Sequence, residues 1–155
     1  MEGFEDEGVY SYRGIPYAAP PVGERRFRPP APVDPWHEVR SAESFGPVSP
    51  QNPSIMEALF GGEGEQWDED CLYLNVWTAD PSPTAALPVM VWIHGGGNTI
   101  GHAGFYDGSH LAASQDVVVL TINYRLGPFG WFRHPSLRAG EANAADRSGN
   151  FGTLD

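Results

Sequence analysis

The segment His94-Gly95-Gly96-Gly97 directly follows an apolar run over residues 87–93. Consecutive glycines reach backbone conformations that other residues avoid, and they let main-chain N–H groups approach a ligand without intervening side chains. Such donors can stabilise the negative oxygen of a tetrahedral intermediate in acyl transfer, where losing one costs about 2.7–4 kcal/mol. The triplet alone leaves two interpretations open, an oxyanion hole and a flexible turn.

Two continuous apolar runs, residues 87–93 and 117–122, must position this loop. Runs without polar alternation are typical of central strands that are covered on both faces. Between them, residues 108–115 predict a short helix that begins near Ser109. A strand, a helix and a strand in succession predict parallel neighbours in an α/β sheet. The glycine triplet would then lie at the carboxyl edge of the sheet, where such folds place their sites.

Two further elements are expected upstream. Residues 71–78 alternate in the two-residue period of a strand that is buried unequally on its two faces. Residues 54–60 begin with Ser54 and carry Glu57 three positions later, which predicts a capped helix that Gly61 and Gly62 would end. Glycine and proline concentrate in residues 15–53 and 95–108, where long loops of functional type are expected.

Composition narrows the classes of partner and compartment. The 155 residues carry a net charge of −11, which argues against nucleic acid or anionic lipid as a partner. The apolar runs are too short to cross a bilayer as helices, so no membrane span is expected. The acidic N-terminus lacks the pattern of a secretory signal. Cys71 is the only cysteine, so no disulfide can form within the chain. A cytoplasmic location is expected.

Several motifs occur in one order and together resemble the type-B carboxylesterase and cholinesterase family. They are Tyr12-Arg13-Gly14-Ile15-Pro16-Tyr17-Ala18-Ala19-Pro20-Pro21-Val22-Gly23, Arg26-Phe27-Arg28-Pro29-Pro30, Glu69-Asp70-Cys71-Leu72-Tyr73-Leu74-Asn75-Val76-Trp77, the strand with its glycine loop, Asn123-Tyr124-Arg125-Leu126-Gly127-Pro128-Phe129-Gly130 and Gly149-Asn150-Phe151-Gly152-Thr153-Leu154-Asp155. Long motifs in the family's order are far more specific than any single short pattern. The resemblance implies an α/β-hydrolase fold, with a central, mostly parallel sheet and crossover helices. It also implies hydrolysis of small carboxylic esters by a Ser–His–acid triad, without a cofactor or a metal.

The resemblance carries the oxyanion-hole role onto Gly96 and Gly97. No G-x-S-x-G nucleophile elbow occurs in the sequence. Residues 1–155 are therefore expected to be the N-terminal segment of one incomplete carboxylesterase domain, truncated before the elbow and inactive alone. The stretch 97–101 imitates an elbow with a threonine, but it continues a glycine-rich loop and is rejected. Ser109 and His110 are rejected as a catalytic pair because adjacent side chains point apart.

The family also implies two structural ion pairs, Arg26 with Glu69 and Arg125 with Asp155. Breaking a buried pair of this kind costs about 3–5 kcal/mol, because it leaves a charge without a partner. Secreted relatives bridge the cysteine at position 71 to an upstream cysteine, and Ser49 stands where that partner would be. A buried free thiol is expected instead. The three histidines at positions 94, 102 and 110 lack carboxylate or thiolate companions, so no metal site is predicted.

Two other interpretations of the chain stay open. It could belong to a non-catalytic, cholinesterase-like adhesion module, because a fold does not fix a function. It could also be an incomplete gene-model fragment. Because the chain is expected to be truncated before the nucleophile elbow, the strand over residues 87–93 would lack the neighbour that leads to the nucleophile, and an exposed apolar edge promotes aggregation.

Overall fold

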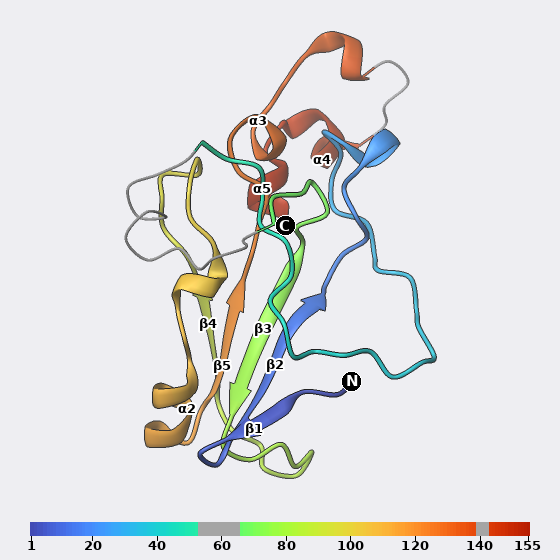
Figure 1. Cartoon of the computed structure of the whole chain (residues 1–155). Coiled ribbons are helices and arrows are strands. Elements are labelled where there is room, and N and C mark those ends of the chain that lie inside the picture. The colour runs from blue at the N-terminus through green and yellow to red at the C-terminus, as the bar shows by residue number, and fades with distance from the viewer. Residues whose placement is uncertain (53–65, 139–142) are drawn as a thin grey trace.

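The computed structural model describes residues 1–52, 66–138 and 143–155. The described strands form one five-stranded sheet in the order β1-β2-β3-β5-β4 (Figure 1). The strands are β1 (Phe4–Asp6), β2 (Val9–Pro16), β3 (Tyr73–Thr78), β4 (Val89–Ile93) and β5 (Val118–Ile122). The helices are α2 (Ser109–Gln115), α3 (Gly127–Gly130), α4 (Ala144–Ser148) and α5 (Phe151–Leu154), with 3-10 turns η1 (Gly23–Arg25), η2 (Ala103–Phe105) and η3 (Pro135–Arg138). The helix predicted over residues 54–60 lies outside the described residues.

The predicted strand-helix-strand unit is confirmed. β4 and β5 pair in parallel from Val89 opposite Val118 to Ile93 opposite Ile122, and α2 lies between them in the sequence. α2 ends where Asp116 adopts a left-handed conformation with φ of +48°. This reversal lets the chain leave the helix and enter β5 at once.

The remaining pairs are antiparallel, so the described part of the sheet is mixed. β3 runs antiparallel to both β2 and β5, and β1 and β2 form an antiparallel hairpin. The hairpin was not predicted from the sequence, because Ser11 is buried in β2 beside Val9 and obscures the apolar alternation of a strand. The strand expected over residues 71–78 is present as β3.

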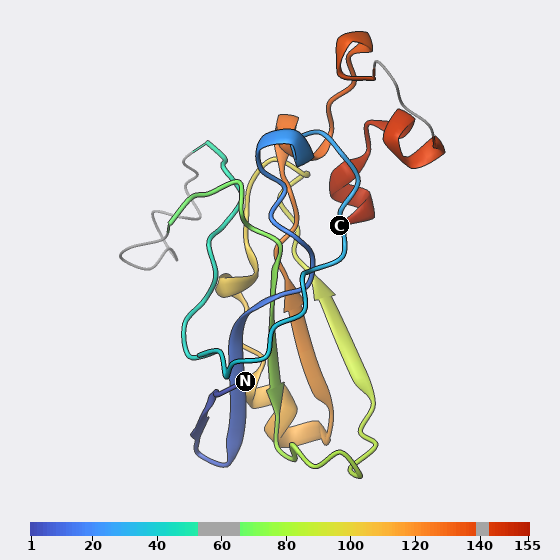
Figure 2. The ribbon, with the colours of Figure 1, turned by 90° about the vertical axis from the view of Figure 1, so that its right-hand side faces the viewer.

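β4 departs from the prediction of a strand covered on both faces. It is the last strand of the sheet (Figure 2). Its five residues are between 49% and 64% exposed. That prediction is wrong for β4, because no element of the described residues covers it or pairs with its outer edge. The alternative expectation, an apolar strand exposed as a sheet edge, is confirmed.

The core lies between α2 and the sheet. α2 contacts β2, β3 and β5, and the buried cluster there contains Val9, Trp77, Ala112, Val117 and Val119. Trp77 is fully buried and is the largest of the fully buried side chains. Within the described part of the chain, no helix is long and apolar enough to span a bilayer.

Candidate active site

The two parallel strands end at the same edge of the sheet and deliver two loops there. The loop over residues 94–101 follows β4, and the loop that contains α3 follows β5. α3, α4 and α5 gather beyond this edge (Figure 1). Two segments that the sequence analysis singled out are therefore neighbours.

Backbone conformation explains the glycines of the first loop. Gly96, Gly97 and Asn98 have φ values of +122°, +62° and +62°, a region that favours glycine. A Cβ atom on Gly96 would lie 1.8 Å from the carbonyl oxygen of Ile100. A Cβ atom on Gly97 would meet nothing within 4 Å. Glycine is required at position 96 because a side chain would clash and because φ is positive there. At position 97 only the positive φ favours glycine.

Carbonyl groups in this loop are occupied, whereas key N–H groups are free. The Gly95 carbonyl accepts from His94 Nδ1 at 2.8 Å, and the Gly96 carbonyl accepts from the N–H groups of Thr99 and Ile100, each at 3.2 Å. Among the described residues, no protein acceptor binds the N–H of Gly96 or Gly97. A peptide is planar and trans, so a bound carbonyl fixes the direction of the next residue's N–H. Both donors are thereby held facing away from those contacts.

His94 orients this loop. The ring is buried and stacks on Tyr124 with centroids 4.4 Å apart, and the Tyr124 hydroxyl donates to the His94 carbonyl at 2.7 Å. Because a carbonyl can only accept, Nδ1 of His94 must carry a proton. Burial lowers the pKa of His94 below its ordinary value. The neutral ring with its proton on Nδ1 is thus the favoured form.

The second loop holds the first directly. The Gly127 N–H donates to the Asn98 carbonyl at 2.7 Å. A hollow of about 380 Å³ lies beside this contact, lined by Pro50, Gln51, Asn52, Thr99, Gly127, Pro128 and Phe129. Thr99 of the first loop and Gly127 of the second both line this hollow, which makes it a candidate space for a small ligand.

Asn123 joins several segments at the same edge, and the sequence analysis did not single it out for this role. Its Nδ2 donates to the Pro47 carbonyl at 3.1 Å, and its Oδ1 accepts from the Ala103 N–H at 2.7 Å. Its own carbonyl accepts from the Tyr17 hydroxyl at 2.7 Å, and burial raises the pKa of Tyr17. These bonds join residues far apart in sequence and so leave no spacing signal.

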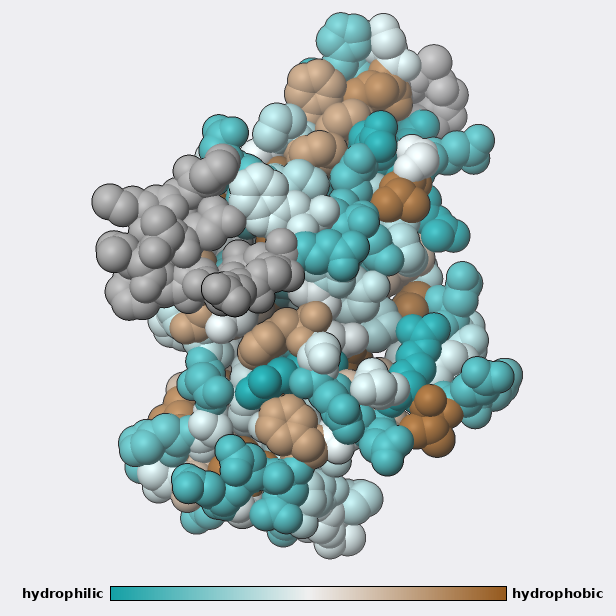
Figure 3. Space-filling model, in the orientation of Figure 1, coloured by the Kyte–Doolittle hydropathy of each residue, from teal (hydrophilic) through white to brown (hydrophobic). Residues whose placement is uncertain are grey.

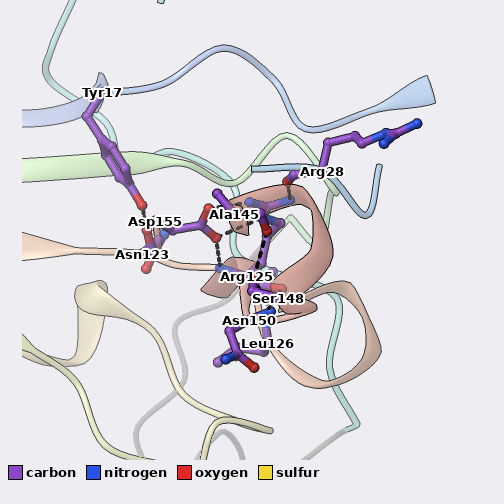
Figure 4. Close-up of polar contacts among 10 residues, drawn as sticks. Tyr17, Arg28, Asn123, Arg125, Leu126, Ala145, Ser148, Asn150 and Asp155 are labelled. Carbon is purple, nitrogen blue, oxygen red and sulfur yellow. Dashed lines mark hydrogen bonds and ion pairs between the residues drawn. The ribbon is translucent and has the colours of Figure 1, made fainter. Parts of the chain in front are cut away.

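Arg125 and Asp155 form a buried pair (Figure 4). Their side chains are 3% and 0% exposed. Asp155 accepts from Arg125 Nη2, from Nε at 2.8 Å and from the Arg125 main-chain N–H at 3.1 Å. Nη1 donates to the Arg28 carbonyl at 2.8 Å. The pair therefore ties the start of the second loop to the end of α5 and to the segment after η1.

Arg26 and Glu69 also meet, but nearer to solvent. Nε and Nη2 of Arg26 donate to the two Glu69 oxygens at 2.5 and 2.6 Å, while the side chains are 45% and 21% exposed. The geometry is bidentate, as it is for Arg125. Solvent screens this pair more strongly than the buried one.

Three phenylalanine rings pack together around α3, in the loop that follows β5. Phe27 stacks with Phe129 at 6.3 Å and packs against Phe132 at 5.1 Å between centroids. Phe132 is 41% exposed, and Figure 3 shows apolar residues gathered at this upper end of the molecule. Phe129 also lines the hollow, so part of its wall is apolar.

Cys71 is buried and free, as the sequence predicts. Burial raises the pKa of its thiol to about 12, although a hydrogen bond with Ser49 acts in the opposite direction. The Ser49 hydroxyl also accepts from the Leu126 N–H at 2.9 Å. Such a thiol is chemically inert and packs as part of the core. No three histidine, cysteine or acidic side chains converge on a possible metal site in the ranges that the structure describes.

Comparisons with known proteins identify the family of the chain. The model of the carboxylesterase family matches residues 1–155. The chain is 45% identical over 157 residues to the para-nitrobenzyl esterase of Bacillus subtilis, covering all of this chain and 30% of that protein. It is 43% identical to the fumonisin B1 esterase of Sphingopyxis macrogoltabida, of which it covers 28%. A solved structure of a PNB esterase superposes with a TM-score of 0.85 and 45% identity, over 98% of this chain and 30% of that one.

The chain spans less than a third of the length of these relatives. The family match extends over its whole length, and the superposed PNB esterase structure covers 98% of the chain. The chain therefore belongs to the carboxylesterase family, and its sheet is part of an α/β-hydrolase fold.

Proposed function

We propose that residues 1–155 supply the oxyanion hole of a serine hydrolase that acts on small carboxylic esters. The observation that carries this proposal is the pair of N–H groups on Gly96 and Gly97, which bind no acceptor among the described residues and whose directions are fixed by bound carbonyls. They lie at the carboxyl edge of the sheet, in the loop whose Thr99 lines a hollow of about 380 Å³. No cofactor is needed for this role.

The proposed role of the loop is to stabilise a negatively charged oxygen with its two N–H donors. When a nucleophilic hydroxyl adds to an ester carbonyl, the carbonyl π electrons move onto oxygen and create a full negative charge. Two preorganised N–H donors stabilise that oxygen more than they stabilise the neutral carbonyl, and this difference lowers the barrier. A general base takes the proton of the attacking hydroxyl and returns it to the leaving oxygen. Collapse of the intermediate then expels the alcohol and leaves an acyl-enzyme, which water hydrolyses.

His94 is not the general base in this proposal. Its Nδ1 proton is engaged by the Gly95 carbonyl, and its ring is buried against Tyr124. The nucleophile, the base and the acid would come from a part of the domain beyond the third that this chain matches. Residues 1–155 alone are therefore expected to be inactive.

A chimera tests the proposal. Residues 1–155 replace the matching part of the Bacillus subtilis para-nitrobenzyl esterase, and the product is called the esterase chimera. Hydrolysis of a para-nitrophenyl ester is measured per active serine, counted by titration with a phosphonate. We expect turnover by the chimera and none by residues 1–155 alone.

Gly97→Ala is the diagnostic variant, because its side chain would meet open space. Gly8→Ala is its matched control, because Gly8 has φ of +82° and equally open space but lies in the turn between β1 and β2. Both should lose similar stability, about 1–2 kcal/mol. The variant keeps the N–H of residue 97, but a strained left-handed residue there should shift this donor, so only Gly97→Ala should also lower kcat per active serine, by about 100-fold. A folded, titratable chimera in which the two variants have equal kcat would refute the proposal.

A further inference from the structure

The side-chain amide of Gln51 forms hydrogen bonds with both the main-chain N–H and the main-chain carbonyl of Gly101, in the glycine-rich loop. Its Oε1 accepts from the Gly101 N–H at 2.6 Å, and its Nε2 donates to the Gly101 carbonyl at 3.1 Å. Nε2 also donates to the Ser49 carbonyl at 3.2 Å. The two bonds to Gly101 use the donor and the acceptor of the Gln51 amide together, and they join residues that are 50 positions apart in the sequence.

Gly101 in turn packs against the beginning of the same loop. Its φ is +104°, and a Cβ atom there would lie 2.7 Å from the Gly95 carbonyl oxygen and 2.9 Å from His94 Nδ1. The contact is therefore directly against the hydrogen bond that orients the Gly95–Gly96 peptide. If Gly101 moved away, the hydrogen bond between His94 Nδ1 and the Gly95 carbonyl would lose the packing contact that confines it.

Other anchors fix the rest of the loop but leave this contact to Gln51. Tyr124 holds the His94 carbonyl, and Gly127 holds the Asn98 carbonyl. Both of these groups belong to the loop that follows β5. Gln51 comes from a third segment, and it is the side chain that holds the end of the loop at Gly101 in the described structure.

We propose that Gln51 is a positioning residue for the oxyanion hole, acting through Gly101 on the N–H groups of Gly96 and Gly97. The inference rests on the proposed function. Gln51 also lines the hollow of about 380 Å³, together with Thr99 of the glycine-rich loop. It is not a catalytic residue, because it acts on the reacting oxygen only through the main chain.

The amide is essential in this arrangement. In Gln51→Glu, the carboxylate could still accept from the Gly101 N–H, but it would place a second acceptor against the Gly101 carbonyl, at the site where Nε2 now lies 3.1 Å away. In Gln51→Met, the side-chain length is kept and both hydrogen bonds are lost. Gln115→Glu and Gln115→Met are matched controls, because Gln115 is exposed at the end of α2 and its side chain, among the described residues, donates only to the adjacent Ser114 carbonyl.

The experiment uses the esterase chimera and normalises every rate to phosphonate-titrated serine. Both Gln51 variants should lower kcat by about 10- to 100-fold, since small misplacements of an active-site group have effects of that size. KM should change by less than about threefold, because the ground-state ester uses these donors weakly. The inhibition constant of a trifluoromethyl ketone, which forms an oxyanion on the serine, should rise in proportion to the loss of kcat/KM. Hydrogen exchange at residues 94–101 should accelerate, and the Gln115 controls should match the parent.

A merely structural role would give a different result. The Gln51 variants would then lower the melting temperature and the titratable fraction, while kcat per active serine and the ketone inhibition constant stayed at parental values. That outcome overturns the inference and leaves the proposed function intact. A folded, titratable parent chimera without turnover, or with turnover insensitive to Gly97→Ala, overturns the proposed function and this inference with it.

Discussion

Removing the carboxylate of Asp155 should destabilise the fold more than removing that of Glu69. Asp155→Ala leaves the Arg125 guanidinium, whose side chain is 3% exposed, with the Arg28 carbonyl as its remaining hydrogen-bond acceptor among the described residues. An unpaired buried charge of this kind costs about 3–5 kcal/mol. Solvent can hydrate the guanidinium of Arg26 after Glu69→Ala, because that side chain is 45% exposed.

The assay is unfolding of the esterase chimera, by heat and by guanidinium chloride. For Asp155→Ala, the melting temperature should fall by at least about 5 °C. The double variant Arg125→Met with Asp155→Leu should recover much of the loss, because it removes the buried charge as well as its partner. Equal destabilisation by Asp155→Ala and Glu69→Ala would show that burial does not govern these two pairs, and the reasoning would fail.

Three further predictions concern the sheet edge, the thiol and the buried histidine. The isolated chain of 155 residues should self-associate through the exposed strand β4, and Val91→Lys should reduce this; a monodisperse monomer with a sharp cooperative melt, seen by light scattering and calorimetry, would contradict it. Ser49→Cys should form a disulfide with Cys71 under oxidising conditions, because the two side chains are in hydrogen-bonding contact; the gain should be about 3 kcal/mol, less the lost hydroxyl bond, and a reducing agent should abolish it. Because folding lowers the pKa of His94, the free energy of unfolding of the chimera should fall as the pH drops below about 6.5, and His94→Asn should remove that share of the pH dependence; parallel pH profiles for parent and variant would contradict it.

Local patterns in the sequence predicted the parallel unit of the fold and failed elsewhere for physical reasons. The apolar runs and the intervening helix were identified because their residues share one environment along each element. β2 was missed because it buries Ser11 next to Val9, so its inward face is not uniformly apolar. The burial of β4 was overestimated because an apolar run reports what a strand requires in a complete sheet, whereas the described residues leave both its faces exposed.

For the site, the sequence predicted the glycine loop and the residues that are now seen to pair as Arg125 with Asp155 and Arg26 with Glu69. These appeared within recognisable motifs. Gln51 and Asn123 were not predicted as anchors, because a hydrogen bond from an amide side chain to a distant main-chain group has no sequence period. Only the folded arrangement brings such partners together.

The distribution of these anchors has a consequence for how an active site could be assembled around the loop. Glycine loses more conformational freedom on folding than any other residue, so a glycine-rich loop needs compensating contacts to hold one conformation. Those contacts come from Gln51, from Thr99 and Ile100, and from the segment that holds Tyr124 and Gly127. All of them lie within residues 1–155. If the proposed function is correct, the anion-binding half of the site is therefore oriented by this chain alone, before a nucleophile is placed against it. This makes the oxyanion hole a preorganised element rather than one induced by the substrate.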